Sequence, residues 1–185
     1  MISADAEPVF RVAVTGHRPN RLPQAACPRL RTQLGAVMAA FEAEHPGRSF
    51  TLLSGLAEGA DRLAAEAALS RGWRLVAMLP FSRARYLEDF PDAAAQAQFA
   101  ALLARATARH EAPDADTYAE TPRAYAELGS RLIADADALI AIWDGEPAQG
   151  RGGTVEVIAA ARAKPIPVIW IHAAKDVAPE RLAPA

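Results

Sequence analysis

The segment Gly16-His17-Arg18 carries side chains that could hold a phosphate group, and it directly follows the apolar run Val9–Thr15. Gly16 allows the chain to turn sharply, and an arginine can bind a phosphate through two parallel hydrogen bonds. A histidine can donate to a phosphate or to a ribose hydroxyl. The alternative is an ordinary turn whose His17 and Arg18 side chains face solvent. We expect a binding role, because both side chains come at the end of a buried run.

A second chemically informative segment is Ser-Gly-Leu-Ala-Glu-Gly-Ala-Asp at positions 54–61. Ser54 and Gly55 would offer a hydroxyl and a closely approaching backbone. A helix is expected from about residue 59, and the free amide groups at its N-terminus would attract an anion. Glu58 and Asp61 would accept hydrogen bonds from ribose hydroxyls, although capping of the same helix explains Asp61 equally well.

The third segment, residues 150–156, is rich in glycine and precedes another expected helix. Gly152 and Gly153 would bring backbone amides against a phosphate, with Thr154 at the N-cap and Glu156 in the first turn. A capped loop without a ligand is the alternative. Trp143 ends the preceding apolar run, and a core role and a ligand-stacking role are equally compatible with its position.

Other classes of site are not indicated. The loops match neither the Gly-x-Gly-x-x-Gly dinucleotide fingerprint nor the Gly-Lys-Ser/Thr ending of a phosphate-binding P-loop. The chain has a single cysteine, Cys27, and its four histidines are far apart in the sequence. We therefore expect no metal site and no separate cofactor.

Short apolar runs alternate with alanine-rich helical stretches throughout the chain. The expected strands are Val9–Thr15, Phe50–Ser54, Leu75–Leu79, Leu139–Trp143 and Ile166–His172, with an optional strand at 107–111. The expected helices are 25–45, 59–71, 83–108, 122–136 and 154–163. This alternation predicts an α/β fold, a doubly wound Rossmann-like domain whose mainly parallel sheet has about five to six strands. Residues 1–185 would form one such domain with its core at about 9–172, and the tail from Ala173 would be loosely attached.

Charge and hydropathy restrict the expected partners. The 185 residues include 20 lysines and arginines against 22 acidic residues, a net charge of −2. Without a basic excess we expect no nucleic acid as a partner. No apolar run approaches the roughly 18 residues of a membrane span, so we expect no membrane partner. The first eight residues lack the basic start of a signal peptide, and the cytoplasm is the expected location.

Together the loops resemble the SLOG superfamily of Rossmann-like domains, which includes DprA-like, YpsA-like and LOG-like proteins. Residues 15–19 are similar to the YpsA-type first loop, and residues 54–61 to the Ser-Gly-x-Ala-x-Gly-x-Asp stretch of DprA-like and YpsA-like members. Residues 136–141 and the Gly-Gly-Thr at 152–154 look like the LOG signature region. The resemblance implies a small-molecule ligand at the glycine loops, either a nucleoside phosphate or an ADP-ribose-like derivative.

Departures from the LOG pattern bear on catalysis. LOG enzymes place a catalytic glutamate three residues after the threonine, where this chain has Val157, and Glu156 comes one residue early. Their Arg-Lys pair on the preceding helix falls near Leu128-Gly129 and is missing. The leading hypothesis is therefore a binding module. The alternative is a LOG-like phosphoribohydrolase that cleaves the N-glycosidic bond of a nucleoside monophosphate, with Glu156 or Glu58 as the carboxylate.

A homodimer is also expected. Alanine-rich helices, in particular residues 93–108, present small side chains that allow two helices to approach closely. The resemblance adds weight, because members of the superfamily often pair through helices.

Overall fold

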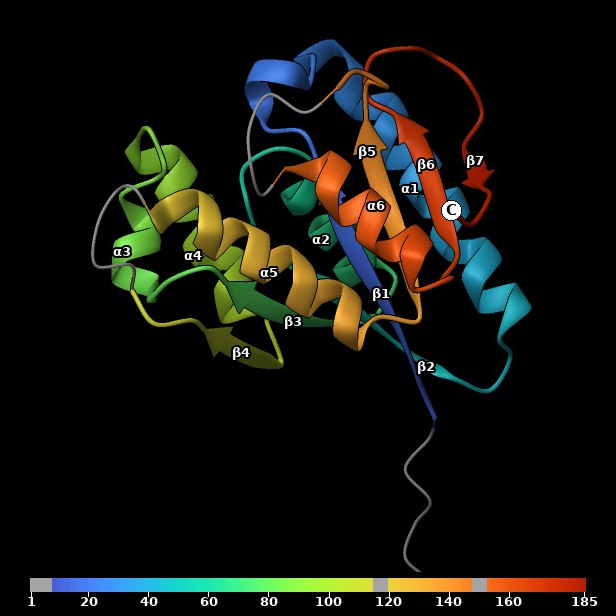
Figure 1. The fold of residues 1–185 in the computed structure, drawn as a ribbon, viewed down its shortest axis with the longest axis horizontal. Helices are drawn as coiled ribbons and strands as arrows, with labels where there is room; N and C mark the ends of the chain where they lie inside the picture. The colour runs from blue at the N-terminus through green and yellow to red at the C-terminus, as the bar shows by residue number, and fades with distance from the viewer. Residues whose placement is uncertain (1–7, 115–119, 148–152) are drawn as a thin grey trace, which may run out of the picture.

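The computed structural model describes residues 8–114, 120–147 and 153–185. Its centre is a seven-stranded sheet in the order β4-β3-β2-β1-β5-β6-β7 (Figure 1). All neighbouring strands are parallel except β6 and β7. In β1, Val12 pairs with Leu52 on one side and with Ala138 on the other. The expected α/β fold with a mainly parallel sheet is confirmed, with one strand more than the upper expectation.

The strands are β1 Val9–Gly16, β2 Ser49–Ser54, β3 Arg74–Leu79, β4 Ala108–Glu111, β5 Ala138–Trp143, β6 Val168–His172 and β7 Glu180–Leu182. The α-helices are α1 Cys27–Glu44, α2 Ala60–Ser70, α3 Arg83–Leu87, α4 Ala93–Ala104, α5 Thr121–Asp135 and α6 Thr154–Ala163. Two short 3-10 helices, η1 Pro19–Arg21 and η2 Gln24–Ala26, connect β1 to α1. No helix in the described ranges combines the length and apolar character that crossing a membrane requires.

Helices cover both faces of the sheet. Helices α5 and α6 lie together over one face, and α1 and α2 lie together over the other (Figure 1). The core under α1 and α2 includes Leu34, Phe41 and Leu63, and the core under α5 and α6 includes Leu132 and Ile158. Strands that are buried on both faces explain the continuous apolar runs in the sequence.

The helix expected over 83–108 is two helices followed by a strand. Pro91 interrupts the backbone hydrogen bonds of a helix, and the Asp92 side chain then caps α4 by accepting from the Ala95 amide at 2.8 Å. The Thr107 amide then donates to the Leu75 carbonyl at 2.8 Å, and the pairing of β3 with β4 starts there. The optional strand at 107–111 is therefore present as β4.

The expectation of a loosely attached tail is wrong. Residues Glu180–Leu182 form β7, which pairs with β6 in antiparallel register. The Arg181 guanidinium lies 2.9 Å from the Glu44 carboxylate of α1, and Arg162 of α6 donates to the Ala183 carbonyl at 2.7 Å. A strand of three residues, in a stretch bounded by Pro179 and Pro184, is too short a pattern to be predicted, and the contacts that hold it come from distant helices.

The order of strands reverses between β1 and β5, because the chain leaves β1 for β2 on one side and returns to β5 on the other. At such a point the loops after the two strands diverge and leave a crevice, which is where α/β sheets of this kind bind ligands. The loops after β1 and β5 contain the first and third segments singled out in the sequence.

Candidate functional site

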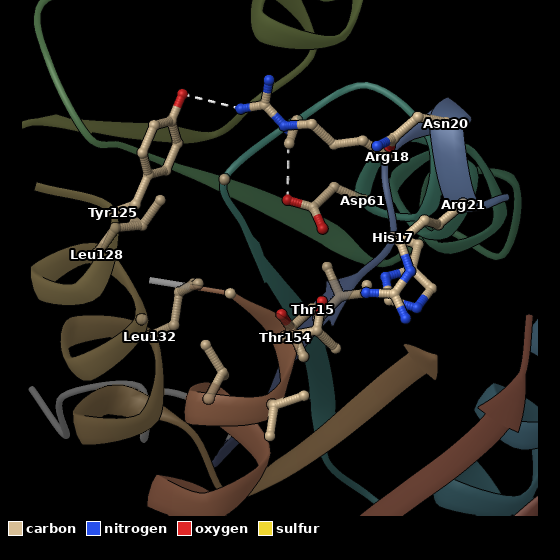
Figure 2. Close-up of a pocket in the computed structure, with 18 of the residues that line it drawn as sticks. Thr15, His17, Arg18, Asn20, Arg21, Asp61, Tyr125, Leu128, Leu132 and Thr154 are labelled. Atoms are coloured by element: carbon tan, nitrogen blue, oxygen red, sulfur yellow. Dashed lines mark hydrogen bonds between the residues drawn. The ribbon is translucent and has the colours of Figure 1, made fainter. Parts of the chain in front are cut away.

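A cavity of about 340 Å³ lies at this crevice (Figure 2). It is enclosed by the ends of β1 and β2, by the start of α2, by α5 and by the first turn of α6. Its lining residues are Val14, Thr15, Gly16, His17, Arg18, Asn20, Arg21, Gly55, Ala57, Asp61, Tyr86, Tyr125, Leu128, Gly129, Leu132, Gly153, Thr154, Val155 and Val157. Segments that are more than a hundred residues apart in the sequence therefore meet at one place.

The loops after β1 and β2 contact each other through their backbones. A β-carbon at Gly16 would lie 2.4 Å from that of Ala60, and one at Gly59 would lie 2.6 Å from the His17 carbonyl oxygen. Gly59 also has φ = +99°, a conformation that favours glycine. The Ala60 amide donates to the same His17 carbonyl at 3.0 Å. Packing of loop on loop thus requires both glycines whether or not a ligand is bound.

Arg18 extends across the cavity to α5. Its guanidinium donates to the Tyr125 hydroxyl at 2.9 Å and lies 5.3 Å from the centre of that ring. The Tyr125 hydroxyl in turn donates to the Asp89 carboxylate. Figure 2 shows the Arg18 side chain above the cavity, between the loop after β1 and α5. A guanidinium fixed in this way presents its remaining N–H groups without further loss of side-chain freedom.

Asp61 is buried in the first turn of α2, with 8% of the residue exposed. Burial is the main cause that raises its pKa to about 7, against the opposing effects of the Ala57 amide, Arg18 and Arg62. Its Oδ2 accepts a hydrogen bond from the Ala57 amide at 3.3 Å. Near neutral pH this carboxyl group is therefore divided between its neutral form, which can donate, and its charged form, which only accepts.

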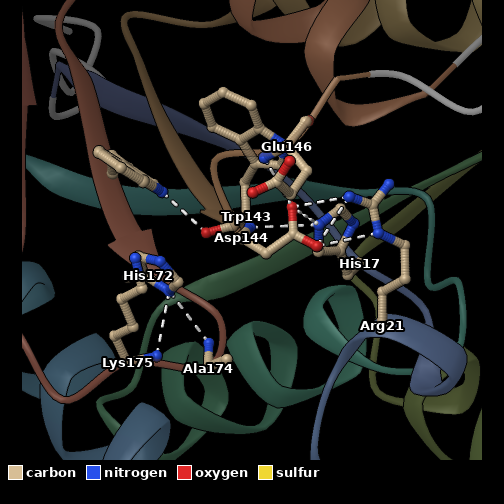
Figure 3. Close-up of polar contacts among 9 residues, drawn as sticks. His17, Arg21, Trp143, Asp144, Glu146, His172, Ala174 and Lys175 are labelled. Atoms are coloured by element: carbon tan, nitrogen blue, oxygen red, sulfur yellow. Dashed lines mark hydrogen bonds and ion pairs between the residues drawn. The ribbon is translucent and has the colours of Figure 1, made fainter.

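A second carboxylate, Asp144, fixes the loop after β5 to the loop after β1 (Figure 3). Its oxygens accept two hydrogen bonds from Arg21, at 2.9 and 2.8 Å, and lie 2.9 Å from His17 Nε2. Burial opposes ionisation, but hydrogen bonds from His17, the Glu146 amide and Arg21 outweigh it and lower the Asp144 pKa to about 2. His17 is buried in this network, and its ring also lines the cavity.

The N-terminus of α6 forms another wall. Gly153 is the N-cap residue, and the amides of Glu156 and Val157 donate to its carbonyl at 3.1 and 3.4 Å. Gly153, Thr154 and Val155 line the cavity. The first amides of a helix have no partner within the helix and carry the positive end of its dipole. This wall is therefore suited to an anion.

The opposite wall is apolar. Leu128, Gly129 and Leu132 of α5 and Val157 of α6 line this side of the cavity together. A β-carbon at Gly129 would lie 2.8 Å from a methyl group of Val157, so the two helices are in close contact there. These positions include the places where LOG-type enzymes carry their Arg-Lys pair and their catalytic glutamate.

Seven of the twelve residues predicted for the site line the cavity: Gly16, His17, Arg18, Gly55, Asp61, Gly153 and Thr154. Three others, Ser54, Trp143 and Glu58, do not line it. The Ser54 hydroxyl accepts from the Leu56 amide at 3.1 Å below the cavity, Trp143 packs against Trp170, and Glu58 borders a second cavity on the far side of the α2 N-terminus.

Glu156 is exposed and does not line the cavity. Each residue of a helix turns the side chain by about 100°. With Thr154 and Val157 facing the cavity, Glu156 faces solvent. The predicted Gly152 lies outside the described residues.

Tyr86 and Tyr125 line the cavity and were not predicted as site residues. Tyr125 lies on α5, far from any strand end, and Tyr86 lies on α3 after β3, where the sequence did not distinguish it from a core residue. Tyr86 is fully buried, and its hydroxyl has no hydrogen-bond partner in the described part of the chain. The signal available in sequence was an aromatic residue in a polar helical turn, which core packing usually explains.

No protein-family model matches the sequence, and no curated protein matches it. Solved structures do match. The structural-genomics target TM1055 is 17% identical with a TM-score of 0.52, covering 86% of this chain and 72% of its own. DNA processing protein A (DprA) from Streptococcus pneumoniae is 18% identical with a TM-score of 0.56, covering 88% of this chain. The match spans only half of that DprA chain.

The expectation of no nucleic-acid partner, drawn from net charge, needs correction. DNA processing protein A from Helicobacter pylori is 18% identical with a TM-score of 0.54, and the match covers 89% of this chain and 65% of that one. That protein has a single-stranded DNA binding mode. A fold of this kind therefore accommodates a nucleic acid, and the net charge of a whole chain does not report the charge at one site. These matches confirm the Rossmann-like α/β fold of the chain.

Proposed function

We propose that the cavity at the strand-order reversal binds a nucleotide or a nucleotide-derived ligand, such as a nucleoside phosphate or an ADP-ribose-like molecule. The observation that carries the proposal is the meeting of three elements around one space: the His17-Arg18 loop, Asp61 of α2 and the α6 N-terminus. A volume of about 340 Å³ is at the lower end of the range for ligand pockets, roughly 300–1,000 Å³. This size favours a mononucleotide over a dinucleotide.

Each wall suits one part of a nucleotide. The phosphate would lie against the first amides of α6 at Gly153 and Thr154, where the helix dipole favours an anion. Asp61 would bind a ribose hydroxyl. The base would lie on the apolar wall formed by Leu128 and Leu132, near the Tyr125 ring.

Thermal shift with AMP, ADP-ribose, NAD and cyclic nucleotides tests the proposal. A ligand at a hundred times its dissociation constant stabilises the folded state by about 2.7 kcal/mol, which is roughly 5–10 °C for a chain of this size. We expect AMP to produce such a shift, and Arg18→Ala to reduce it. The matched control is Arg123→Ala, which removes an exposed arginine of α5 whose partner is Glu127. Absence of a shift with every one of these nucleotides would overturn the proposal.

The alternative function, hydrolysis of an N-glycosidic bond, has weaker support. Among the described lining residues, Asp61 is the only carboxylate, since Glu58 and Glu156 lie outside the cavity. Incubation with AMP and chromatography of free base separates the two functions. We expect no base at an ordinary enzymatic turnover, roughly 1 per second. If free base is released at that rate and either Asp61→Asn or Glu156→Gln abolishes the release, the hydrolase is established instead.

Single-stranded DNA is a second candidate ligand, favoured by the binding mode of the Helicobacter pylori neighbour. One nucleotide of a strand could occupy the same cavity. Salt titration of a fluorescent oligonucleotide distinguishes the cases, because each phosphate contact contributes about −0.7 to the logarithmic salt slope for single strands. A salt slope steeper than the slope for AMP, by an amount that corresponds to several phosphate contacts, would support DNA. Loss of the oligonucleotide signal on addition of AMP would show that both ligands use one site.

A further inference from the structure

One end of the cavity at the strand-order reversal is the start of α6. The first donor within this helix is the Glu156 amide, which bonds to the Gly153 carbonyl at 3.1 Å. The amides of Thr154 and Val155 come before it and have no acceptor within the described ranges. Free N–H groups at the positive end of a helix dipole suit an anionic oxygen. This end is the phosphate position of the proposed function.

The other end of the cavity is formed by Arg18. Its side chain is only partly buried, and the bond to the Tyr125 hydroxyl is the only hydrogen bond that it makes within the described ranges. Its other nitrogens keep accessible surface, since none of them is a buried atom without a partner. A guanidinium has five N–H donors. Most of the donors of Arg18 are therefore open to a ligand in the cavity that it lines.

Tyr86 adds a donor to the wall beside Arg18. It is fully buried, its ring lies 6.4 Å from that of Tyr125, and its hydroxyl has no hydrogen-bond partner in the described part of the chain. Arg18 acts electrostatically on this hydroxyl. The wall at the Arg18 end thus has more donors than acceptors, which favours negative charge in the adjoining space.

The two ends are separated along α5. Arg18 bonds to Tyr125, whereas the first turn of α6 contacts α5 at Gly129, where a β-carbon would lie 2.8 Å from a Val157 methyl group. Tyr125 and Gly129 are four residues apart in this helix, which corresponds to about 6 Å along its axis. The two ends can therefore hold two separate anionic groups.

Asp61 stands between the two ends. Figure 2 shows its carboxyl group between Arg18 and Thr154. The Ala57 amide donates to Oδ2 at 3.3 Å, and no side chain of the described ranges donates to either oxygen. A carboxylate repels an anion but accepts a hydrogen bond from a hydroxyl group. Along the cavity, the positions therefore suit an anion, a hydroxyl group and a second anion, in that order.

We propose that the ligand of this cavity is a ribonucleoside with a phosphate on each side of its ribose, either a free nucleoside 3′,5′-bisphosphate or the equivalent residue of an RNA strand. This inference rests on the proposed function and narrows its ligand class. The 5′-phosphate accepts from the amides of Thr154 and Val155, and the 3′-phosphate accepts from Arg18. The 2′-hydroxyl, the only hydroxyl of the ribose left free, donates to Asp61.

Calorimetric titration with adenosine, AMP, adenosine 3′,5′-bisphosphate and the 2′-deoxy form of the bisphosphate tests the inference. We expect the bisphosphate to bind about 10- to 100-fold more tightly than AMP, as a hydrogen bond to a charged group would give. The 2′-deoxy form should bind about tenfold more weakly than the ribose form, for the same reason. Competition with a short oligoadenylate identifies the source. Displacement of the bisphosphate indicates an RNA strand, and retention indicates the free nucleotide.

Variants assign the second phosphate to Arg18. Arg18→Ala should remove most of the preference for the bisphosphate over AMP, whereas Arg123→Ala, at an exposed arginine of α5, should keep it. Because Arg18 also holds Tyr125, Arg18→Lys keeps the charge and should keep part of the preference. Crystals of the wild-type protein with the bisphosphate give an independent test. They should show one phosphate at Arg18 and the other at the start of α6.

The outcomes separate this inference from the proposed function. If neither AMP nor the bisphosphate binds, both are overturned. If AMP binds and the second phosphate adds no affinity, or if the added affinity survives in Arg18→Ala, this inference alone is overturned. A crystal structure with both phosphates away from Arg18 would have the same consequence.

Discussion

Two carboxyl groups at the residue scale illustrate how neighbours set the charge of the site. Asp61 is buried beside backbone amides, and burial raises its pKa to about 7. Asp144 is also partly buried, but Arg21 and His17 bind its oxygens directly, and its pKa is lowered to about 2. The two residues should therefore affect the stability of the protein in opposite pH ranges.

Asp61→Asn should flatten the pH dependence of stability between pH 4 and 7. A folded pKa raised from 3.8 to about 7 means that Asp61 stabilises the fold below pH 4 and loses that contribution as the pH rises. At about 1.4 kcal/mol per pKa unit the loss is on the order of 4 kcal/mol. Urea unfolding at pH 5, 7 and 8.5 measures it. Asparagine should make the protein more stable at pH 8.5, whereas the exposed control Asp135→Asn should keep the wild-type slope.

Asp144→Asn should have the opposite dependence. A pKa lowered from 3.8 to about 2 adds stability above pH 4, and the contribution is lost as the pH falls toward 2. At about 1.4 kcal/mol per pKa unit, the substitution should lower the free energy of unfolding at pH 7 by on the order of 2 kcal/mol. Urea unfolding at pH 7 and pH 3 should show this cost shrinking with acidity. An equal cost at both values would mean that Asp144 acts through packing instead of charge.

The site residues that could be predicted from the sequence are those that follow strands. His17, Arg18 and Asp61 could be found because parallel strands bring their carboxyl ends to one edge. The role of Tyr125 could not, since it depends on how far α5 crosses the sheet and on the reach of the Arg18 side chain. The separation of Asp61 from Glu58 into two cavities likewise depends on the rotation of α2, which no local pattern determines.

At the scale of elements, the first turn of α6 combines an uncapped N-terminus with an opening to the cavity. Gly153 has φ = −90° and ψ = 174°, an extended conformation that any residue adopts. No side chain of the described ranges caps the helix. Within those ranges the first amides are therefore available to a ligand, and glycine at this position leaves them uncovered.

Gly153→Val should abolish stabilisation by the nucleotide while the fold remains intact. The valine side chain would stand over the amides that we propose for the phosphate, and its backbone conformation is allowed. The thermal shift with AMP is the measurement, with circular dichroism as a check on folding. Ala159→Val is the matched control, because it adds the same side chain on the exposed face of α6. An unchanged shift in Gly153→Val would remove this turn from the site.

Element boundaries were less predictable than element types. The apolar runs gave β1, β2 and β3 to within a residue or two, because both faces of these strands are covered by helices. The break between α3 and α4 was missed, although Pro91 and Asp92 are a stop and a cap, because residues that favour a helix stand on both sides of it. Strand β7 was missed because its pairing with β6 is not local.

At the scale of the whole molecule, the surface offers few large apolar side chains for an interface between two copies. Val177, at 49% exposure, is the only large hydrophobic residue exposed in the described parts of the chain. A homodimer stays a prediction, and its contacts would have to come from small side chains. Helix α4 offers these, since Ala93, Ala97, Ala101 and Ala104 are exposed and recur every three or four residues along one face.

We expect the chain to form a homodimer in which α4 packs against its symmetry mate, because alanines allow two helix backbones to approach closely. Twelve residues of helix span only about 18 Å, so neighbouring residues must contribute to reach the roughly 1,000 Å² of a stable interface. Light scattering at micromolar concentration should give twice the 19.7 kDa chain mass. Ala97→Glu should halve the measured mass by placing two like charges in the contact, whereas Ala40→Glu on the exposed face of α1 should not. A wild-type mass equal to one chain would refute the dimer, and an Ala97→Glu dimer would place the contact on another element.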